Sequence, residues 1–436
     1  GEDPYLGSCF ARKKIQGLQN NQESVEDYVA ACVKHYVAYG ACESGRDYNT
    51  TSMSISQLHN VYLPTFKAAV EEGAATAMAS FNDLNGVPCT VNEYTLRQVL
   101  KDGYGLDGFV VSDANGIKEC VAHGIAEDEK DAGCQAVNAG LDMDMGTNIY
   151  SKNLEQLIKE GKVSMDTVDE AVRRILSVKV WLGLFENPYV PDEVIEQYEK
   201  ALPEEHVATT LEAAKKSIVL LKNETQTLPL KPGTKIGLYG AGAVRTIKGG
   251  TGSGDVNNRY NVNIYDGLKN AGYEITSVEW LEGYDRGYLA ARESWKSEIF
   301  RKLTEECNGN FFEAYSTTPF SMPAGAAIDE AAAKEDGAEI AMYVLARIAG
   351  ENADRRDEAG DYYIRVNGSG YTGNYQFTLQ THAHKWKNEI TKATLTQNGT
   401  IIQKCACGET GRITTIYRPK TVRLSKTRYK YNGYAQ

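Results

Sequence analysis

The chain has 436 residues, a formal net charge of −11 and 42% hydrophobic residues. This length suits two or three domains with substantial cores, and the acidic balance without a Lys/Arg run argues against nucleic acid and anionic membrane surfaces as partners. No stretch reaches the roughly 18 apolar residues of a membrane-spanning helix, and the N-terminus lacks the charged-then-apolar pattern of a signal peptide.

Helical and strand patterns alternate through the first part of the chain. Apolar residues at helical spacing predict helices at 24–30, 54–72, 95–101 and 128–139, and two more within 154–181. Short apolar runs between them predict strands at 31–39, 75–81, 109–111 and 141–145. The alternation indicates a parallel sheet with right-handed crossovers, and four such strands are half of an eight-stranded barrel.

The rest of the chain divides into three further parts. Prolines and charges at 186–204 indicate a linker. A second α/β unit follows, with an amphipathic segment at 211–221, strands at 235–239 and 338–346, a helix within 260–272 and a charged insert at 284–336 that we expect to be helical and surface-facing. Beyond 361 the pattern has period two. We therefore predict an α/β fold class: a partial TIM-like barrel (1–185), a linker (186–210), a partial α/β sandwich (211–363) and a small all-β tail (364–436).

Asp113 is the first candidate for chemistry. It comes directly after the apolar run Phe109, Val110 and Val111, where the predicted strand breaks into a polar turn. Ligands bind at the carboxyl ends of parallel strands, so an acid at this place is a candidate catalytic residue. The alternative, which the local pattern alone favours, is an Asp that N-caps the helix starting near Gly116.

Two other groups of polar residues lie within or just after predicted strands. Lys34, His35 and Arg46 could donate hydrogen bonds to vicinal hydroxyls on the rim of a barrel, although a Lys-His pair is more often a solvated strand end. Glu351 follows the apolar strand at 338–346. Its spacing alone favours a solvated loop residue over an acid offered to a cleft.

The glycine and cysteine patterns give no strong cofactor or metal signal. Gly240-Ala-Gly242 lacks the third glycine of a dinucleotide fingerprint, and the loop at 249–255 lacks the Lys-Ser/Thr of a phosphate-binding loop. His382-x-His384 and Cys405-x-Cys407 could supply four zinc ligands, but the usual two-residue spacer is absent. We expect no cofactor and no metal. The nine cysteines are scattered and odd in number, so most are expected to be buried free thiols.

Several motifs, taken in order, carry a family resemblance. They are GEDP at 1–4, VKHY at 33–36, GRDYN at 45–49, FNDLNG at 81–86, GFVVSD at 108–113, AGLDM at 139–143, GSGD at 252–255 and GENADR at 350–355. Together they resemble glycoside hydrolase family 3, and in particular its bacterial β-glucosidases, including the periplasmic type. The resemblance implies a retaining glycosidase with its active site between a barrel and a sandwich domain. It implies Asp113 as the nucleophile and a sugar-binding set of Asp3, Lys34, His35, Arg46 and Met78.

The resemblance leaves two glutamates as candidates for the acid/base. Glu351 matches family members whose sandwich domain offers a loop glutamate to the barrel, whereas Glu119 matches the periplasmic subgroup. A general acid must reach the glycosidic oxygen while the nucleophile lies on the opposite side of the anomeric carbon. A residue on a separate domain meets this constraint more readily, so we favour Glu351.

The sequence also departs from the family. Members have further barrel strands before Gly1, including an Arg and an Asp that bind sugar; Ala114 and Phe81 stand where a Trp and a Tyr are common. The tail resembles a pre-peptidase C-terminal domain followed by a bacterial Ig-like repeat. These departures suggest a fragment or composite chain with incomplete catalysis.

The expected function is exo-acting hydrolysis of terminal β-linked sugars, with a β-glucoside or oligosaccharide as the partner. The alternative is a carbohydrate-binding or surface-attached protein with an inactive hydrolase remnant. The resemblance implies a secreted, periplasmic or cell-surface protein, with the cytoplasm as the alternative. The sequence leaves the oligomeric state open.

Overall fold

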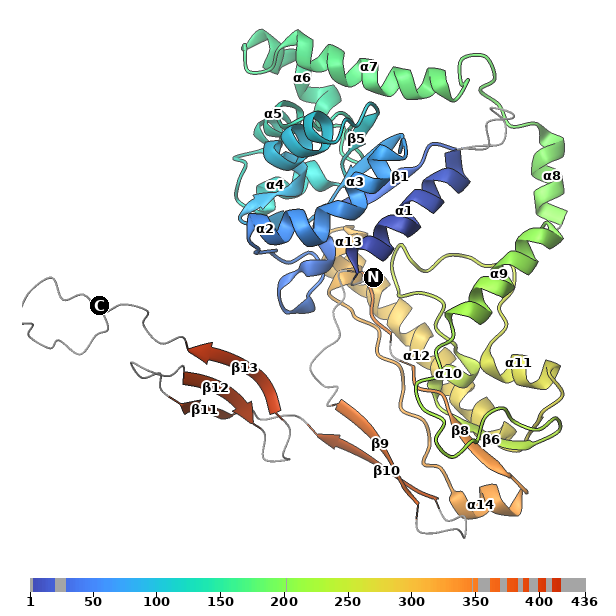
Figure 1. The fold of residues 1–436 in the computed structure, drawn as a ribbon. Helices are drawn as coiled ribbons and strands as arrows, with labels where there is room; N and C mark the ends of the chain where they lie inside the picture. Colours follow the sequence, from blue (N-terminus) through green and yellow to red (C-terminus); the bar gives the residue numbers. More distant parts are fainter. Residues whose placement is uncertain are drawn as a thin grey trace, which may run out of the picture. The chain divides into compact units, whose positions relative to one another are not determined.

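The computed structural model describes residues 3–19, 29–200, 202–346 and 348–351, and the backbone of five strands between 361 and 416. The chain divides into two compact units. The first contains 1–246, 256–289 and 324–346, and the second contains 247–255, 290–323 and the residues from 347 onward. Figure 1 shows the course of the chain and the labels used below.

A helix that the sequence patterns did not indicate opens the first unit. This helix, α1 (Pro4–Gln19), packs on α3 (Leu63–Glu71). Gln19, which is buried, fixes the end of α1: its Oε1 accepts from Ala31 N at 2.8 Å, and its Nε2 donates to Gly73 O at 2.7 Å. The side-chain amide thus joins α1 to the start of the first strand. The predicted helix at 24–30 falls largely outside the described residues.

Three parallel strands form the sheet that carries the candidate site. They are β1 (Cys32–Tyr36), β2 (Thr76–Ala79) and β5 (Phe109–Val111), in the order β1-β2-β5. Cys32 pairs with Thr76, and Thr76 pairs with Phe109. The predicted parallel sheet is therefore confirmed. The fourth predicted strand, at 141–145, is reduced to one parallel bridge between Val111 and Met143.

The helices of this part agree with the sequence pattern. Tyr36 is fully buried in its core: its ring packs edge-on against Phe66 with centroids 5.0 Å apart, and its hydroxyl donates to Thr95 O at 2.8 Å. The helices are α2 (Ile55–Gln57), η4 (Leu58–Tyr62), α3, η6 (Tyr94–Gly103), α4 (Gly116–Ala122), α5 (Glu129–Ala139), α6 (Ile149–Lys159) and α7 (Met165–Trp181).

A second three-stranded parallel sheet follows. Its order is β7-β6-β8, with β6 (Lys235–Tyr239) central and β7 (Glu274–Ile275) and β8 (Ile340–Tyr343) at its sides. The predicted strands at 235–239 and 338–346 are confirmed. Gly240 has φ +95°, and a Cβ there would lie 2.3 Å from Val344 O, so close packing against the end of β8 requires this glycine.

Helices accompany this sheet, and two of them lie where a linker was predicted. The segment 186–210 contains α8 (Asp192–Lys200) and the first part of α9 (Glu204–Ser217), so much of it is helical rather than irregular. The predicted helix within 260–272 is α11 (Ile264–Asn270), and α10 (Ala241–Val244) is a single turn after β6. The predicted domain boundaries themselves stay a prediction.

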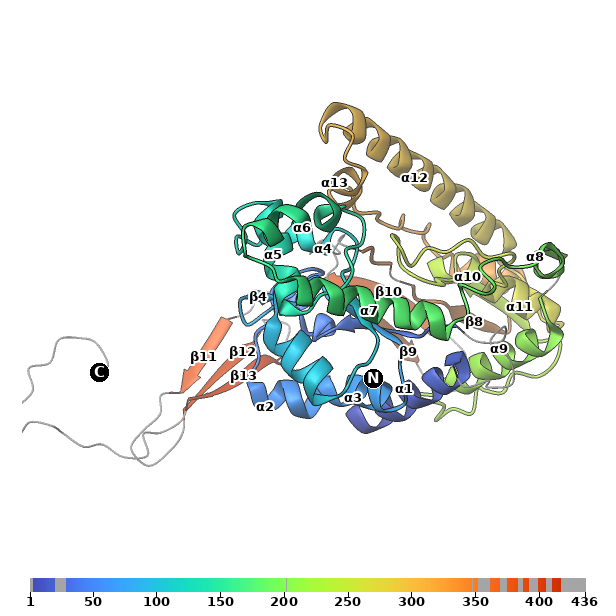
Figure 2. The same cartoon turned by 90° about the horizontal axis from the view of Figure 1, so that it is seen from above.

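The insert at 284–336 is helical as expected but is not wholly surface-facing. It contains most of α12 (Val278–Glu305), together with α13 (Phe311–Ser316) and α14 (Glu330–Glu335). Figure 2 shows α13 beside one end of α12. Ile299, Cys307, Ala314 and Tyr315 are buried there and pack with Trp295 and Leu303 into a core of their own.

The described part of the tail is all-β, as predicted. Strands β9 (Asp361–Gly368) and β10 (Tyr375–His382) form an antiparallel hairpin, and β11 (Lys387–Thr391), β12 (Gly399–Lys404) and β13 (Thr410–Ile416) form a second antiparallel sheet. His384, Cys405 and Cys407 of the zinc hypothesis lie outside the described residues. Among the described helices, none is long and apolar enough to cross a membrane.

Candidate active site

Asp113 lies at the carboxyl end of β5 and contacts His35 from β1. Asp113 Oδ2 is 3.2 Å from His35 Nε2, and Oδ1 accepts from Ala114 N at 2.8 Å. The Asp113 side chain is 12% exposed. It does not N-cap α4: Asn115 holds the cap position with φ 63°, and Gly116 N donates to the backbone oxygen of Asp113. The capping interpretation is therefore wrong, and the carboxylate faces the rim of the sheet.

The segment after α5 fixes the backbone around Asp113. Ser112 N donates to Met143 O at 2.9 Å, and Met145 N donates to Ser112 Oγ at the same distance. Asn115 N donates to Met145 O at 3.0 Å. Hydrogen bonds before and after Asp113 thus hold the turn on both sides. They limit the positions that the Asp113 side chain can adopt.

A buried ion pair supports the same strand from the other direction. Lys101 Nζ lies 2.7 Å from Asp142 Oδ1, and Asp142 Oδ2 accepts from Val110 N at 2.8 Å. The two side chains are 1% and 4% exposed. Burial raises the pKa of Asp142 and lowers the pKa of Lys101. The pair could not be predicted from local sequence patterns, because its residues lie 41 positions apart.

Two of the predicted sugar-binding residues, Lys34 and Met78, contact each other on the adjacent strands β1 and β2. Lys34 on β1 is exposed, and its Nζ lies 4.0 Å from Met78 Sδ on the adjacent β2. His35, the next residue, contacts Asp113 as described above. The structure therefore brings Lys34, His35, Met78 and Asp113 to one end of one sheet.

Two other predicted residues have different surroundings. Arg46 is exposed in the loop after η3 (Glu43–Gly45). Asp3 immediately precedes α1, where its Oδ1 accepts from Leu6 N at 2.9 Å. This contact gives Asp3 a capping role. The sugar-binding roles of Arg46 and Asp3 stay predictions.

Aromatic rings surround His35 and form a cluster that no sequence pattern had indicated. His35 and Tyr39 have ring centroids 5.2 Å apart, and Tyr48 packs on Phe81 at 4.4 Å. Tyr39 also donates a hydrogen bond to Asp47. The signal available was the placement of Tyr39 and Phe81 just past β1 and β2. Ring faces beside a few polar groups are typical of small-molecule sites.

Glu119 on α4 has an altered acidity. Burial, followed by the negative charge of Asp113, raises the pKa of Glu119 to about 7. A carboxyl group with this pKa is partly protonated near neutral pH and can serve as a general acid.

Glu351 belongs to the second unit, where a glycine-rich loop holds it. Glu351 Oε2 accepts from Ser253 N at 2.7 Å, and Thr251 forms a parallel bridge with Gly350. Gly252 has φ +97°, and a Cβ there would lie 2.6 Å from Glu351 Cβ. The close approach of Glu351 therefore requires a glycine at position 252 of the loop. A phosphate ligand is not needed to explain this glycine.

Comparison with known proteins identifies the family. The model described as "Glycosyl hydrolase family 3 N terminal domain" matches residues 1–178, and the one described as "Glycosyl hydrolase family 3 C-terminal domain" matches 218–393. The chain belongs to glycoside hydrolase family 3. The second match ends within the β-rich tail, beyond the predicted boundary at 363. The resemblance of that tail to other surface modules stays a prediction.

Relatives of this family 3 chain include named β-glucosidases. It is 40% identical to the periplasmic β-glucosidase of Salmonella typhimurium, over 65% of this chain and 38% of the relative. It is 34% identical to thermostable β-glucosidase B of Acetivibrio thermocellus, over 74% of this chain and 40% of the relative. The chain therefore spans about two fifths of the length of these relatives.

Solved structures of the family match as well. The β-glucosidase of Listeria innocua in complex with isofagomine aligns with a TM-score of 0.58 at 37% identity, over 63% of this chain and 39% of that one. β-Glucosidase 3B from Thermotoga neapolitana aligns with a TM-score of 0.61 at 30% identity, over 82% of this chain and 45% of that one. These matches agree with the α/β fold class predicted from the sequence.

Proposed function

We propose that the protein is a retaining, exo-acting β-glycosidase that hydrolyses terminal β-linked glucosyl units. The observation that carries this proposal is the contact between Asp113 and His35 at the carboxyl ends of parallel strands. Relatives named β-glucosidase and β-xylosidase support the reaction class. Solved structures titled as complexes with glucose and laminaribiose, from Listeria innocua, support glucosyl units as the substrate.

In this proposal Asp113 is the nucleophile. One carboxylate oxygen attacks the anomeric carbon, the bond to the leaving oxygen breaks, and a glycosyl ester forms on Asp113. Water then cleaves this ester and regenerates the carboxylate. The backbone N–H of Ala114 on Oδ1 and the imidazole at Oδ2 orient the carboxylate. Lys34 and Met78 would contact the bound sugar, with the rings of Tyr39 and Phe81 covering its apolar faces.

We propose Glu351 as the acid/base. The second carboxyl group of a retaining enzyme protonates the leaving oxygen and later activates water. The Ser253 N–H holds one oxygen of the Glu351 carboxyl group in a defined place. This orientation supports a role as general acid, because proton transfer requires the carboxyl group to point at the leaving oxygen. Glu119 is the second candidate, and its pKa of about 7 favours it. Glu119 follows Asp113 by only six residues, however, whereas the acid must approach from the other side of the sugar.

The nucleophile can be tested by trapping. Incubation with a 2-deoxy-2-fluoro-β-glucoside slows the second step, so a glycosyl adduct should accumulate and map to the peptide that contains Asp113. Asp113→Asn should give no adduct. An adduct on another carboxylate would refute the assignment. Retention of glucose without any adduct or turnover would instead favour the carbohydrate-binding alternative.

We also propose that the protein acts outside the cytoplasm. The 40% identical relative is named a periplasmic β-glucosidase, which supports this location. Fractionation of cells that express the gene with its own upstream sequence tests it. Recovery of the protein in the periplasm, the medium or the cell surface is expected, and recovery in the cytosol alone would contradict it.

A further inference from the structure

Hydrogen bonds between backbone atoms join the Glu351 segment to the glycine-rich loop of the second unit. Thr251 N donates to Ala349 O at 3.2 Å, and Glu351 N donates to Thr251 O at 3.0 Å. Thr251 is 5% exposed. The main chain of Glu351 is therefore fixed, and the Ser253 N–H is one of the contacts that set the position of its carboxyl group.

The turn at 252–255 decides where that N–H points. Asp255 N donates to Gly252 O at 3.1 Å and closes the turn around Ser253. If the turn opens, the Ser253 donor moves away from Glu351. Asp255, the last residue of the turn, is thus the point at which an outside contact can stabilise it.

Arg292 on α12 makes such a contact. Its Nη2 lies 3.5 Å from Asp255 Oδ2, and Lys248 Nζ lies 3.8 Å from Asp255 Oδ1. The Arg292 side chain is 20% exposed, less than the 36% of Lys248. Both cations approach the carboxylate that ends the turn, but Arg292 comes from an element outside the loop.

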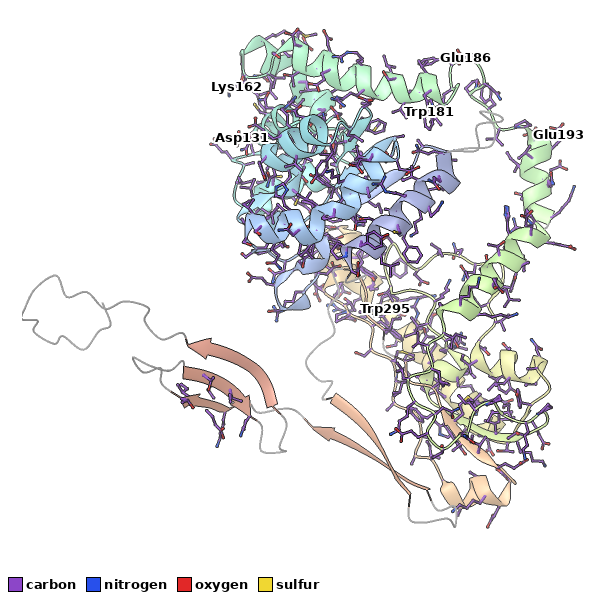
Figure 3. All side chains as sticks on the ribbon, in the orientation of Figure 1. Asp131, Lys162, Trp181, Glu186, Glu193 and Trp295 are labelled. Carbon is purple, nitrogen blue, oxygen red and sulfur yellow. The ribbon has the colours of Figure 1, made fainter. Side chains whose placement is uncertain are left out.

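Aromatic rings hold the Arg292 guanidinium in place. Its Cζ lies 4.5 Å from the ring centroid of Trp295 and 5.1 Å from that of Phe320. Figure 3 labels Trp295. Trp295 is anchored in turn, since its Nε1 donates to Thr318 O at 2.5 Å. A guanidinium that is already ordered by stacking loses less freedom when it binds a carboxylate.

The same rings reach the other side of the turn. Trp295 packs edge-on against Tyr315, with centroids 6.0 Å apart. Tyr315 is buried, and its hydroxyl lies 3.3 Å from the place that a Cβ on Gly252 would occupy. Both ends of the turn therefore meet one cluster: Arg292 contacts Asp255, and Tyr315 lies beside Gly252.

We propose that Arg292 is a positioning residue for Glu351. It holds Asp255, keeps the 252–255 turn closed, and so keeps the Ser253 N–H on the Glu351 carboxyl group. This inference rests on the proposed role of Glu351 as the acid/base. Asp255 is exposed, and an ion pair with an exposed carboxylate contributes little to overall stability. The effect of Arg292 should accordingly appear in the placement of Glu351 and not in the melting temperature.

The contact can be measured without turnover. In protein labelled with 15N-serine, the Ser253 amide resonance is assigned by its loss in Ser253→Ala and should move in Glu351→Gln. Arg292→Met should move it in the same direction. The matched control is Arg301→Met, because Arg301 is also on α12 but pairs with Glu298, Glu305 and Glu306. A Ser253 resonance that stays in place in Arg292→Met overturns the inference.

A second variant covers the case in which Arg292→Met does not fold. Asp255→Asn keeps the shape of the side chain and removes its charge, so it should move the Ser253 resonance while leaving the stacking of Arg292 on Trp295 intact. An unmoved resonance in Asp255→Asn also overturns the inference.

Substrate choice separates the role of Arg292 from the role of Glu351. A misplaced acid matters most when the leaving group is poor. Arg292→Met should lose at least 10-fold in kcat/KM on a β-linked disaccharide and less than 3-fold on a dinitrophenyl β-glucoside. Equal losses on both substrates contradict the inference. If the resonance moves but Glu351→Gln keeps full activity on the disaccharide, the acid/base assignment fails and the catalytic part of the inference fails with it.

Discussion

His35 Nε2 lies 3.2 Å from Asp113 Oδ2, across a sheet in which β2 separates the strands that carry the two residues. The contact joins the end of β1 to the turn after β5. Only the parallel order of three strands brings residues 78 positions apart to the same rim. An intact contact between His35 and Asp113 therefore indicates that this part of the chain is correctly folded and that the proposed nucleophile is correctly placed.

Replacement of His35 tests that contact. His35→Gln removes the imidazole whose Nε2 lies 3.2 Å from Oδ2 of the nucleophile. We expect the rate of 2-fluoroglycosyl adduct formation on Asp113 to fall roughly 10- to 100-fold. The control is His59→Gln, because His59 is exposed and bonds to Tyr94 on a neighbouring helix. Similar rates in both variants would contradict the proposed role of His35.

The two candidate acids can be told apart by leaving group and by rescue. Glu351→Ala should lose roughly 100- to 10,000-fold in activity on a natural disaccharide and much less on a dinitrophenyl glucoside, because an activated leaving group needs no acid. Azide should restore turnover and give β-glucosyl azide, since a small anion can replace the missing base. If Glu119→Ala behaves this way and Glu351→Ala stays near wild type, the acid/base is Glu119.

The ionisation of Glu119 should also make the free energy of unfolding depend on pH. Its pKa is raised from 4.5 to about 7 in the fold, so the native state binds a proton that the unfolded state has released. The stability from this group is fully present below pH 4.5 and is lost as the pH rises through 7. We expect the wild type to lose about 1–3 kcal/mol more than Glu119→Gln between pH 5 and pH 8, measured by denaturant unfolding. Glu155→Gln, an exposed change on α6, should lose as much as the wild type.

Breaking the buried Lys101–Asp142 pair should strongly destabilise the sheet formed by β1, β2 and β5. Lys101→Met leaves Asp142 as a buried carboxyl group without its cation, which costs roughly 3–5 kcal/mol. Lys101→Met with Asp142→Asn should recover part of this loss, because the amide can still accept from Val110 N. Chemical denaturation of the three proteins measures the difference. A single variant as stable as the wild type would show that the pair is not needed.

Local sequence patterns predicted much of the fold but few of the contacts that hold the site residues in place. The strand at 235–239 agrees with β6 because a continuous apolar run inside a buried sheet leaves few alternatives. The local pattern alone favours Asp113 as a helix cap, because nothing nearby shows that Asn115 takes the left-handed conformation at that place. Helix α1 was missed because only Ile15 and Gln19 are buried on it, which leaves a weak apolar stripe.

Long-range contacts explain the rest of what the sequence could not provide. Ser253 and Glu351 are 98 positions apart, and Lys101 and Asp142 are 41 apart. Each contact depends on a fold that must form first. Family motifs marked Asp142, Gly252 and Glu351 as significant residues, but a motif does not say which atom meets which.

Two glycines of one loop offer the sharpest test of how Glu351 is held. Gly252 has φ +97°, and a Cβ on it would lie 2.6 Å from Glu351 Cβ and 2.9 Å from Oε2. Gly252→Ala therefore strains the backbone by about 1–2 kcal/mol and pushes the carboxyl group off the Ser253 N–H. Gly254 lies in the same loop, but a Cβ there would meet nothing within 4 Å. We expect Gly252→Ala to lose most of its activity on a disaccharide while Gly254→Ala keeps it, and we expect both to bind a glucosyl inhibitor at the Asp113 site. Equal activity in the two variants would show that the close approach of Gly252 to Glu351 has no part in catalysis.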